Sequence, residues 1–112
     1  MESTRQEKIA KLLQKDLGEI FQREAQLHAP GKLITVTVVR VSPDLGIARI
    51  YLSVFPSSDA ASVVETINLH KGHYRNLLAK KVRHQLRVIP DVQFYMDDSE
   101  DYVRNIDSLL NE

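Results

Sequence analysis

Two stretches of alternating side chains joined by a short turn constrain the fold of this chain more than any other part of its sequence. Residues 33–41, LITVTVVRV, are rich in β-branched side chains, and residues 47–54, IARIYLSV, alternate in the same way. Residues 42–46, SPDLG, have the composition of a turn, in which Pro43 presets φ and Gly46 can adopt a positive φ. The sequence therefore predicts a β-hairpin.

Each predicted strand has one apolar face, and a third strand follows near the end of the chain. The side chains expected to point inward are Ile34, Val36 and Val38, then Ala48, Ile50, Leu52 and Val54, and finally Val92, Phe94 and Met96. The positions between them hold Thr35, Thr37, Arg49, Tyr51, Gln93 and Tyr95. Such alternation is typical of a sheet that is covered on one face only. Because RNP-type aromatic motifs are missing, we favour a solvated open face over a base-stacking platform.

Helical periodicity flanks the hairpin on both sides. Residues 4–27 follow the candidate N-caps Ser3 and Thr4, and Pro30 ends this first helix. Its apolar stripe consists of Ile9, Leu12, Leu13, Leu17, Ile20, Phe21 and Leu27. After the hairpin, a short helix contains Val63, Val64 and Ile67, and a second stripe contains Tyr74, Leu77, Leu78, Val82 and Leu86.

A single helix through both of these later segments would turn Lys71 and Arg75 towards the apolar side. A kink at Gly72 removes most of this mismatch, so we predict two helices that meet at Gly72. Ser99 can cap a last short helix, with Tyr102, Val103, Ile106, Leu109 and Leu110 spaced to dock. The predicted class is α+β, in the order α-β-β-α-α-β with a small C-terminal appendage.

Composition places these elements in one domain. The chain has 112 residues, 43% of them apolar, so we predict a single domain over residues 1–112, with residues 97–112 as its acidic appendage. No apolar run reaches the roughly 18 residues of a membrane span, and the N-terminus lacks the apolar core of a secretory signal. The sequence contains no cysteine, which excludes disulfides and thiol catalysis and fits the reducing cytoplasm.

The formal net charge of zero conceals two regions of opposite sign. Residues 70–87 contain six bases, no acid and three of the four histidines, whereas residues 91–112 contain seven acids and one base. This polarity favours a polyanionic partner for the basic region. The alternative is that the acidic segment forms salt bridges with the basic helix of the same molecule.

The outer face of the predicted helix after Gly72 is the most informative part of the sequence. One stripe opposite the core contains His73, Asn76, Lys80, Arg83, His84 and Arg87, and it is flanked by Lys71, Arg75 and Lys81. No carboxylate interrupts this stripe, and each Lys or Arg can pair with a phosphate oxygen. We therefore favour a nucleic-acid surface over an ordinary solvated face, which usually mixes both signs.

Two further sets of residues are weaker candidates for the same surface. His70, Lys71 and Gly72 lie at the predicted break, where a small residue between helices lets a nucleic-acid backbone approach closely, as in KH domains. A full GxxG is absent, and simple chain punctuation is the alternative. Lys8, Lys11 and Lys15 share the outer side of the first helix, but Glu7 and Glu19 are nearby.

Motifs for catalysis or cofactor binding are absent from the sequence. His70 and His73 have a spacing that suits metal ligands, but no carboxylate close in sequence completes a site. The acids of residues 97–101 fit a connection rich in helix caps better than a Mg²⁺ cluster. Because no HExxH, P-loop, GxSxG or GxGxxG occurs, we expect no catalytic residue, no metal site and no cofactor.

Several motifs resemble those of bacterial ribosome-binding factor A, over nearly the whole chain. They are residues 39–54, VRVSPDLGIARIYLSV, the Gly72 helix break, residues 83–91, RHQLRVIPD, and residues 94–99, FYMDDS. The resemblance implies a KH-like fold of type II, ordered α-β-β-α-kink-α-β, with the third strand beside the first and parallel to it. The family's kink is usually Ala-x-Gly, and here His70 stands in place of the alanine.

The same resemblance implies a function in ribosome biogenesis. The family's members are RNA-binding factors, not enzymes, that bind the free small (30S) ribosomal subunit and its rRNA. They act in its late maturation and in processing of the rRNA 5′ end, and they are linked to cold adaptation. We accordingly expect a monomeric cytoplasmic protein without a membrane partner. A KH-like protein-interaction module with little direct RNA contact is the alternative.

Overall fold

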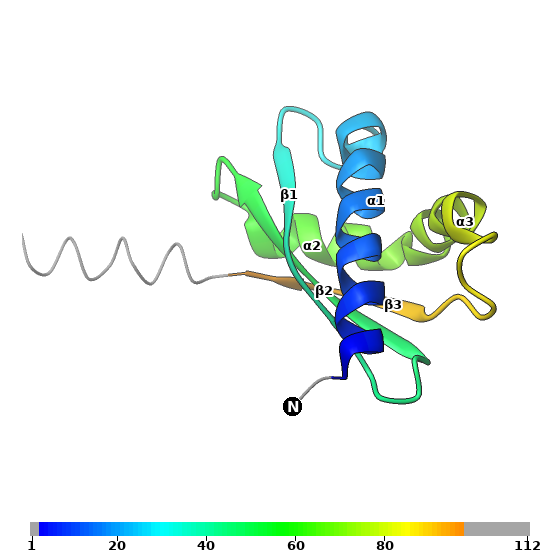
Figure 1. Cartoon of the computed structure of the whole chain (residues 1–112). Coiled ribbons are helices and arrows are strands. Elements are labelled where there is room, and N and C mark those ends of the chain that lie inside the picture. The colour runs from blue at the N-terminus through cyan, green and yellow to red at the C-terminus, as the bar shows by residue number, and fades with distance from the viewer. Residues whose placement is uncertain (1–2, 98–112) are drawn as a thin grey trace, which may run out of the picture.

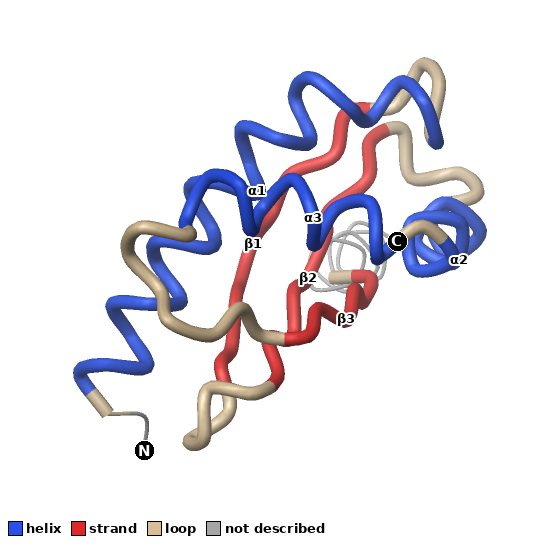
Figure 2. Tube along the Cα trace, turned by 90° about the vertical axis from the view of Figure 1, so that its right-hand side faces the viewer, coloured by secondary structure: helices blue, strands red, loops and turns tan. Residues whose placement is uncertain are grey.

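The computed structural model describes residues 3–97, and its elements follow the predicted order. They are α1 (Thr4–His28), β1 (Leu33–Val41), β2 (Ile47–Phe55), α2 (Ala60–Leu69), α3 (Lys71–Val82) and β3 (Asp91–Met96). Figure 1 shows the helices and the three-stranded sheet, and in Figure 2 α3 crosses in front of the strands. Antiparallel and parallel pairing occur in the same sheet, so the predicted α+β class with a mixed sheet is confirmed.

The start of α1 is fixed by a capping box. The Ser3 hydroxyl accepts a hydrogen bond from the Gln6 amide at 3.1 Å, and the Gln6 side-chain oxygen accepts one from the Ser3 amide at 2.8 Å. The buried Gln6 side chain also donates to the carbonyl of Val41 at 2.9 Å, which ties this end of α1 to the end of β1. At the other end of α1, Leu27 does not belong to the apolar stripe as predicted, because it is 67% exposed.

The β1–β2 hairpin has the predicted bounds except that β2 continues through Phe55, and it contains an irregularity that the alternation did not reveal. Val36 pairs with Leu52 and Val38 with Tyr51, so Thr37 is an extra residue in β1. A bulge of this kind reverses the facing of every side chain after it. Val38 is therefore exposed, contrary to prediction, whereas Val39 and Val41 point into the core. The four predicted inward residues of β2 are all buried.

The residue that adopts a positive φ in the turn between β1 and β2 differs from the one predicted. Leu45, not Gly46, adopts the left-handed conformation, with φ of 61°. The Asp44 carboxylate accepts hydrogen bonds from the Ser42 hydroxyl at 2.6 Å and from the Gly46 amide at 3.0 Å. These local bonds hold Gly46 in ordinary geometry and leave Leu45 to complete the reversal of the chain.

The third strand pairs with β2 and not with β1, which corrects the topology implied by the resemblance. The strand order is β1-β2-β3, and β3 runs parallel to β2 with Ile50 opposite Phe94. Both α2 and α3 pack on β3. The chain thus leaves the sheet after β2, passes through the two helices and returns to pair with β2 itself. Asn68 of α2 reinforces this position by exchanging two hydrogen bonds, of 2.8 and 2.9 Å, with the backbone of Phe94. Met96, predicted to face inward, is 36% exposed at the strand end.

The core joins α1, α3 and the sheet through three aromatic side chains. Phe21 of α1 lies 4.8 Å from Tyr74 of α3 and 5.7 Å from Phe94 of β3, measured between ring centroids. All three are at most 2% exposed. The polar positions of the sheet face away from this cluster, so the helices cover one face only. The predicted helix after Ser99 lies outside the described residues.

The break between α2 and α3 is confirmed, but it lies at His70 and not at Gly72. His70 has φ of −110° and ψ of 21°, and it ends α2 and begins α3. Its amide donates to the carbonyl of Ile67 at 3.0 Å, and its own carbonyl accepts from the amide of His73 at 3.0 Å. Gly72 lies in the first turn of α3 without a positive φ, and a Cβ added there would meet nothing within 4 Å.

We expect Gly72→Ala to raise the free energy of unfolding by about 0.4–1 kcal/mol, because alanine loses less backbone freedom on entering a helix. Urea denaturation followed by circular dichroism measures the change. Gly31 supplies the control, since its φ of 77° makes an added Cβ unfavourable. Gly31→Ala should therefore destabilise the same protein, and a loss of stability for Gly72→Ala would contradict the helical assignment.

Candidate nucleic-acid interface

A cluster of three histidines surrounds the break between α2 and α3. The rings of His28 and His70 lie 4.1 Å apart, and those of His28 and His73 lie 5.9 Å apart. His28 Nδ1 is 2.6 Å from the Tyr74 hydroxyl, and His73 Nε2 is 3.6 Å from a Glu24 carboxylate oxygen. The cluster thus connects the last turn of α1 to the start of α3. His28 was missing from the predicted site because only the fold brings it to this break.

The environment of the cluster shifts the pKa of His28 and of the adjoining Tyr74. Burial lowers the pKa of His28, and the nearby His70 and His73 lower it further. Burial raises the pKa of Tyr74 to about 12, so its hydroxyl is protonated at neutral pH and can donate to His28 Nδ1. The neutral form of His28 is therefore the one that fits the folded protein.

We expect the protein to lose stability as the pH falls through the histidine range. Because the pKa of His28 is below its ordinary value of 6.5 in the folded state, the unfolded chain binds more protons, and stability falls as the pH drops below that value. Thermal midpoints measured from about pH 7.5 to 5 should show this slope. His28→Gln should flatten it, whereas the exposed His84→Gln should not. Equal slopes in the two variants would contradict the assignment to His28.

Two of the predicted phosphate-binding bases have partners within the molecule. Arg75 donates to the carbonyls of Ile89 at 2.8 Å and Pro90 at 3.2 Å, and its Nε lies 3.5 Å from Asp91 Oδ1. Lys81 Nζ is 2.7 Å from Glu19 Oε2 and lowers the pKa of that carboxyl group. Arg75 thus holds the α3–β3 loop in place, and Lys81 joins α3 to α1.

The bases at the end of α3 are exposed, but they do not all belong to one helical stripe as predicted. The helix ends at Val82, so Arg83, His84 and Arg87 lie in the loop that leads to β3. The apolar period continues to Leu86 because the loop begins with turns, in which the amides of Gln85 and Leu86 donate to the Val82 carbonyl. Within residues 3–97, Lys80, Arg83 and Arg87 have no ion pair. At the start of α3, Lys71 and Gly72 are exposed, and Asn76 is exposed on the outer side of the helix.

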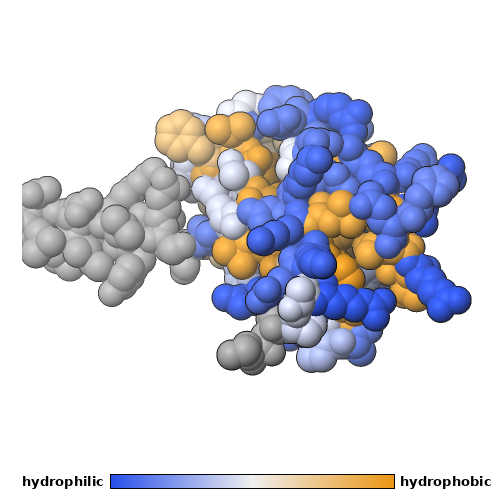
Figure 3. All heavy atoms as spheres, viewed as in Figure 1, coloured by the Kyte–Doolittle hydropathy of each residue, from blue (hydrophilic) through white to orange (hydrophobic). Residues whose placement is uncertain are grey.

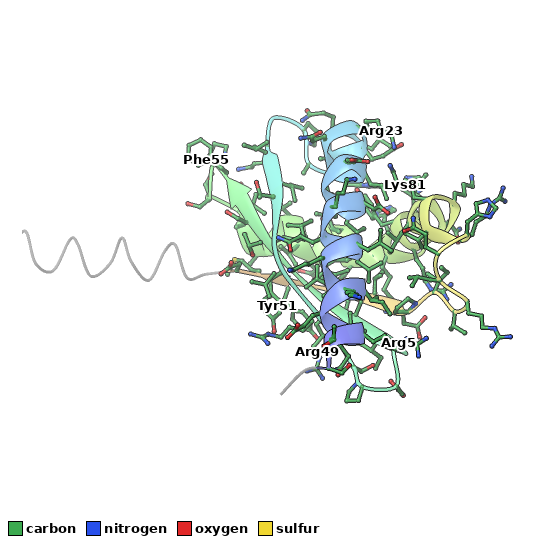
Figure 4. All side chains as sticks on the ribbon, viewed as in Figure 1. Arg5, Arg23, Arg49, Tyr51, Phe55 and Lys81 are labelled. Atoms are coloured by element: carbon green, nitrogen blue, oxygen red, sulfur yellow. The ribbon has the colours of Figure 1, made fainter. Side chains whose placement is uncertain are left out.

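The lysines of α1 add to this positive surface. Lys8, Lys11 and Lys15 are exposed on the side of α1 that faces away from the sheet. Lys8 approaches the α3–β3 loop, since it lines the same cleft as Arg87. We call Lys8, Lys11, Lys15, Lys80, Arg83 and Arg87 the basic surface. Hydrophilic residues cover much of this side of the molecule in Figure 3, and Figure 4 shows Lys81 on the side of α1 that faces α3.

The open face of the sheet differs in character from the basic surface. Tyr51 and Tyr95 stack there with ring centroids 5.5 Å apart, and Arg40 and Arg49 are opposite each other on β1 and β2. Asp97 accepts a hydrogen bond from the Thr37 hydroxyl at 2.6 Å, so the first acid of the predicted appendage lies on this face. The rest of the acidic segment lies outside the described residues, so the alternative in which it pairs with the basic helix stays open.

Neither a metal site nor a membrane span is found in the part of the chain that the structure describes. Among residues 3–97, no three histidine, aspartate or glutamate side chains are arranged to hold a metal ion. Over the same range, no helix combines the length and the apolarity needed to cross a membrane. The exposed cations of the basic surface, with no ion pair at Lys80, Arg83 or Arg87 within residues 3–97, make it the candidate site that the geometry supports best.

Comparison with protein families and curated proteins covers almost the entire chain. The family model of ribosome-binding factor A matches residues 5–110. The ribosome-binding factor A of Cytophaga hutchinsonii is 39% identical over 112 residues, which cover 100% of this chain and 84% of that protein. The protein of the same name from Christiangramia forsetii is 45% identical over 110 residues, covering 97% of this chain and 84% of that protein.

Solved structures show the same architecture. The crystal structure of ribosome-binding factor A from Thermus thermophilus has a TM-score of 0.69 at 21% identity, covering 81% of this chain and 94% of that chain. A homology model of the Thermus thermophilus protein, fitted into a cryo-EM map of a 30S complex, has a TM-score of 0.65 at 26% identity, covering 80% and 91%. With its family model, its relatives and its fold in agreement, this chain belongs to the ribosome-binding factor A family.

Proposed function

We propose that this protein is a non-enzymatic RNA-binding assembly factor that binds the free small ribosomal subunit in the cytoplasm. The observation that carries the proposal is the basic surface, in which Lys80, Arg83 and Arg87 are exposed and have no acidic partner within residues 3–97. The resemblance to a Thermus thermophilus protein fitted in a 30S complex supports the choice of subunit. The protein would act in late maturation, including processing of the rRNA 5′ end, and in cold adaptation.

Phosphate contacts are sufficient for such a role. Lysine and arginine side chains bind phosphate oxygens whatever the base sequence, and they release condensed counterions as they do so. A factor that binds one conformation of the rRNA more tightly than another shifts the population towards the first. No bond has to be made or broken by the protein, so this mechanism needs neither a catalytic group nor a cofactor.

We assign the predicted bases two different roles in this mechanism. Arg75 and Lys81 are positioning residues, because their internal partners hold the loop and α3 against the rest of the molecule. His70, His73 and Gly72 surround the start of α3, which no side-chain cap closes, and the N-terminus of a helix carries a partial positive charge. We propose that this end contacts the rRNA backbone together with Lys71, and that the basic surface supplies most of the affinity.

Co-sedimentation with purified ribosomal particles tests the proposal. The protein should pellet with free small subunits and should pellet less with large subunits or assembled ribosomes. Binding should weaken steeply as salt rises from about 50 to 200 mM, because phosphate contacts depend on counterion release. Binding that is insensitive to salt would favour the protein-interaction module instead. Cleavage of rRNA that is abolished by EDTA would contradict the non-enzymatic assignment.

A further inference from the structure

A cleft of about 660 Å³ lies where α1 begins, between its first turns, the β1–β2 turn and the α3–β3 loop. We call it the α1–loop cleft. Its apolar lining consists of Ile9, Leu45, Leu86, Val88 and Pro90. Three bases, Arg5, Lys8 and Arg87, line the same cleft. An aliphatic surface beside several positive charges is a combination that phosphate binding alone does not require.

Hydrogen bonds between distant parts of the chain fix the walls of this cleft. Gln6 of α1 donates to the carbonyl of Val41 at 2.9 Å, and the amide of Asp91 donates to the carbonyl of Gly46 at 2.9 Å. Arg75 holds the loop from the other side through its bond to the carbonyl of Ile89 at 2.8 Å. The cleft is therefore preformed, which reduces the entropy lost when a ligand binds.

Two side chains, Val88 and Leu45, give the cleft its exposed apolar surface. Val88 is 68% exposed although the loop around it is pinned on both sides. Leu45 adopts φ of 61°, a conformation that glycine or asparagine adopts with less strain. Leu45 is half-buried and packs in part against the core, so the rest of its aliphatic surface is available to the cleft at the cost of backbone strain, and strain of this kind concentrates at functional sites.

The charges of the cleft select the polar part of the ligand. Arg5, Lys8 and Arg87 are exposed, and Asp44 is the acid among the lining residues. The Asp44 carboxylate already accepts hydrogen bonds from Ser42 and Gly46, and these bonds lower its pKa. The field in the cleft is thus positive and favours carboxylates or phosphates.

The apolar part of the lining decides between these two anions. RNA bases are held mainly by stacking on aromatic rings, and none of the described residues that line the cleft is aromatic. Aliphatic side chains instead suit a leucine or isoleucine anchor. We propose that the α1–loop cleft binds an acidic peptide segment of a protein partner, with an aliphatic anchor against Leu45 and Val88 and carboxylates against the three bases.

This proposal goes beyond RNA binding, and neutral changes in the apolar lining test it without touching Lys8 or Arg87 of the basic surface. The probe is a fluorescein-labelled peptide with a central leucine flanked by glutamates, and binding to the full-length protein is followed by fluorescence anisotropy. Leu45→Asn and Val88→Ser should each weaken the peptide complex by about tenfold, the expected effect of losing one buried aliphatic contact. Thermal midpoints establish that both variants fold.

A matched peptide with serine in place of the leucine and a labelled oligouridine provide the comparisons. The serine peptide should bind about tenfold more weakly at equal charge, and oligouridine should bind the wild type and both variants alike. Equal affinity for the two peptides, or unchanged peptide binding in both folded variants, would overturn the proposal. If Leu45→Asn and Val88→Ser weaken oligouridine and not the peptide, the cleft holds a nucleotide and the proposal is wrong.

Discussion

Replacing Lys80, Arg83 and Arg87 together by glutamine is expected to flatten the salt dependence of RNA binding by about 2 units in a plot of log K against log[salt]. Each lost phosphate contact on a single strand contributes about 0.7 to that slope. The three side chains are exposed and make no ion pair within residues 3–97, so the thermal midpoint should stay close to that of the wild type. Fluorescence anisotropy with a labelled RNA over a range of salt concentrations gives the slope.

A pair of double variants with equal charge provides the control. Arg83→Gln with Arg87→Gln removes two arginines from the basic surface, and Arg40→Gln with Arg49→Gln removes two from the open face of the sheet. The Arg83/Arg87 double variant should reduce the slope of log K against log[salt] by about 1.4, whereas the Arg40/Arg49 double variant should leave that slope unchanged. The competing hypothesis, in which the acidic segment binds these bases internally, predicts a lower thermal midpoint and undiminished binding to small subunits. That result for the triple variant would refute the assignment of this surface to RNA.

Phe94→Ala should be strongly destabilising, lowering the free energy of unfolding by about 3–5 kcal/mol. The ring is 2% exposed and meets both Phe21 and Tyr74 edge-on, so its loss leaves a cavity where α1, α3 and the sheet join. A domain of this size is stable by only about 5–15 kcal/mol, so a large share of its stability would be lost. Urea denaturation measures the difference.

Tyr95, the next residue in β3, is a suitable control for this change. It lies on the open face, is 38% exposed and stacks on Tyr51. Tyr95→Ala should therefore lower the free energy of unfolding much less than Phe94→Ala, because removing a side chain from the open face leaves little buried cavity. Similar losses for the two variants would mean that the sheet is covered on both faces, contrary to the one-sided packing of the helices.

The sequence predicted those parts of the fold in which local preference and burial agree. The inward residues of β2, from Ala48 to Val54, alternate without interruption because this central strand is paired on both sides. The bulge at Thr37 was not predictable, since nothing in a β-branched run indicates which residue will be left unpaired. The end of α3 was misplaced for a similar reason, because the apolar period continues through Leu86 although the helix ends at Val82.

The candidate site was predicted as a set of residue types but not as a set of roles. Charge patterning identified the basic region, and Lys80, Arg83 and Arg87 are exposed. It could not identify the partner of Lys81, because Glu19 is separated from it by 62 positions in the chain. Arg5 and His28 were overlooked for the same reason. Arg5 lines a cleft with segments distant in the sequence, and His28 contacts Tyr74 of α3 only in the folded protein.

The pairing of β3 with β2 determines the order in which the sheet can be completed as the chain is synthesised. The β1–β2 hairpin closes through a short turn, whereas β3 can join only after residues 56–90 have emerged and folded back. Until then one edge of β2 presents unpaired amides and carbonyls, which other extended chains can recognise. The nascent protein therefore depends on prompt pairing of β3 with β2. Conditions that slow this pairing will expose the edge of β2 to aggregation before the core is complete.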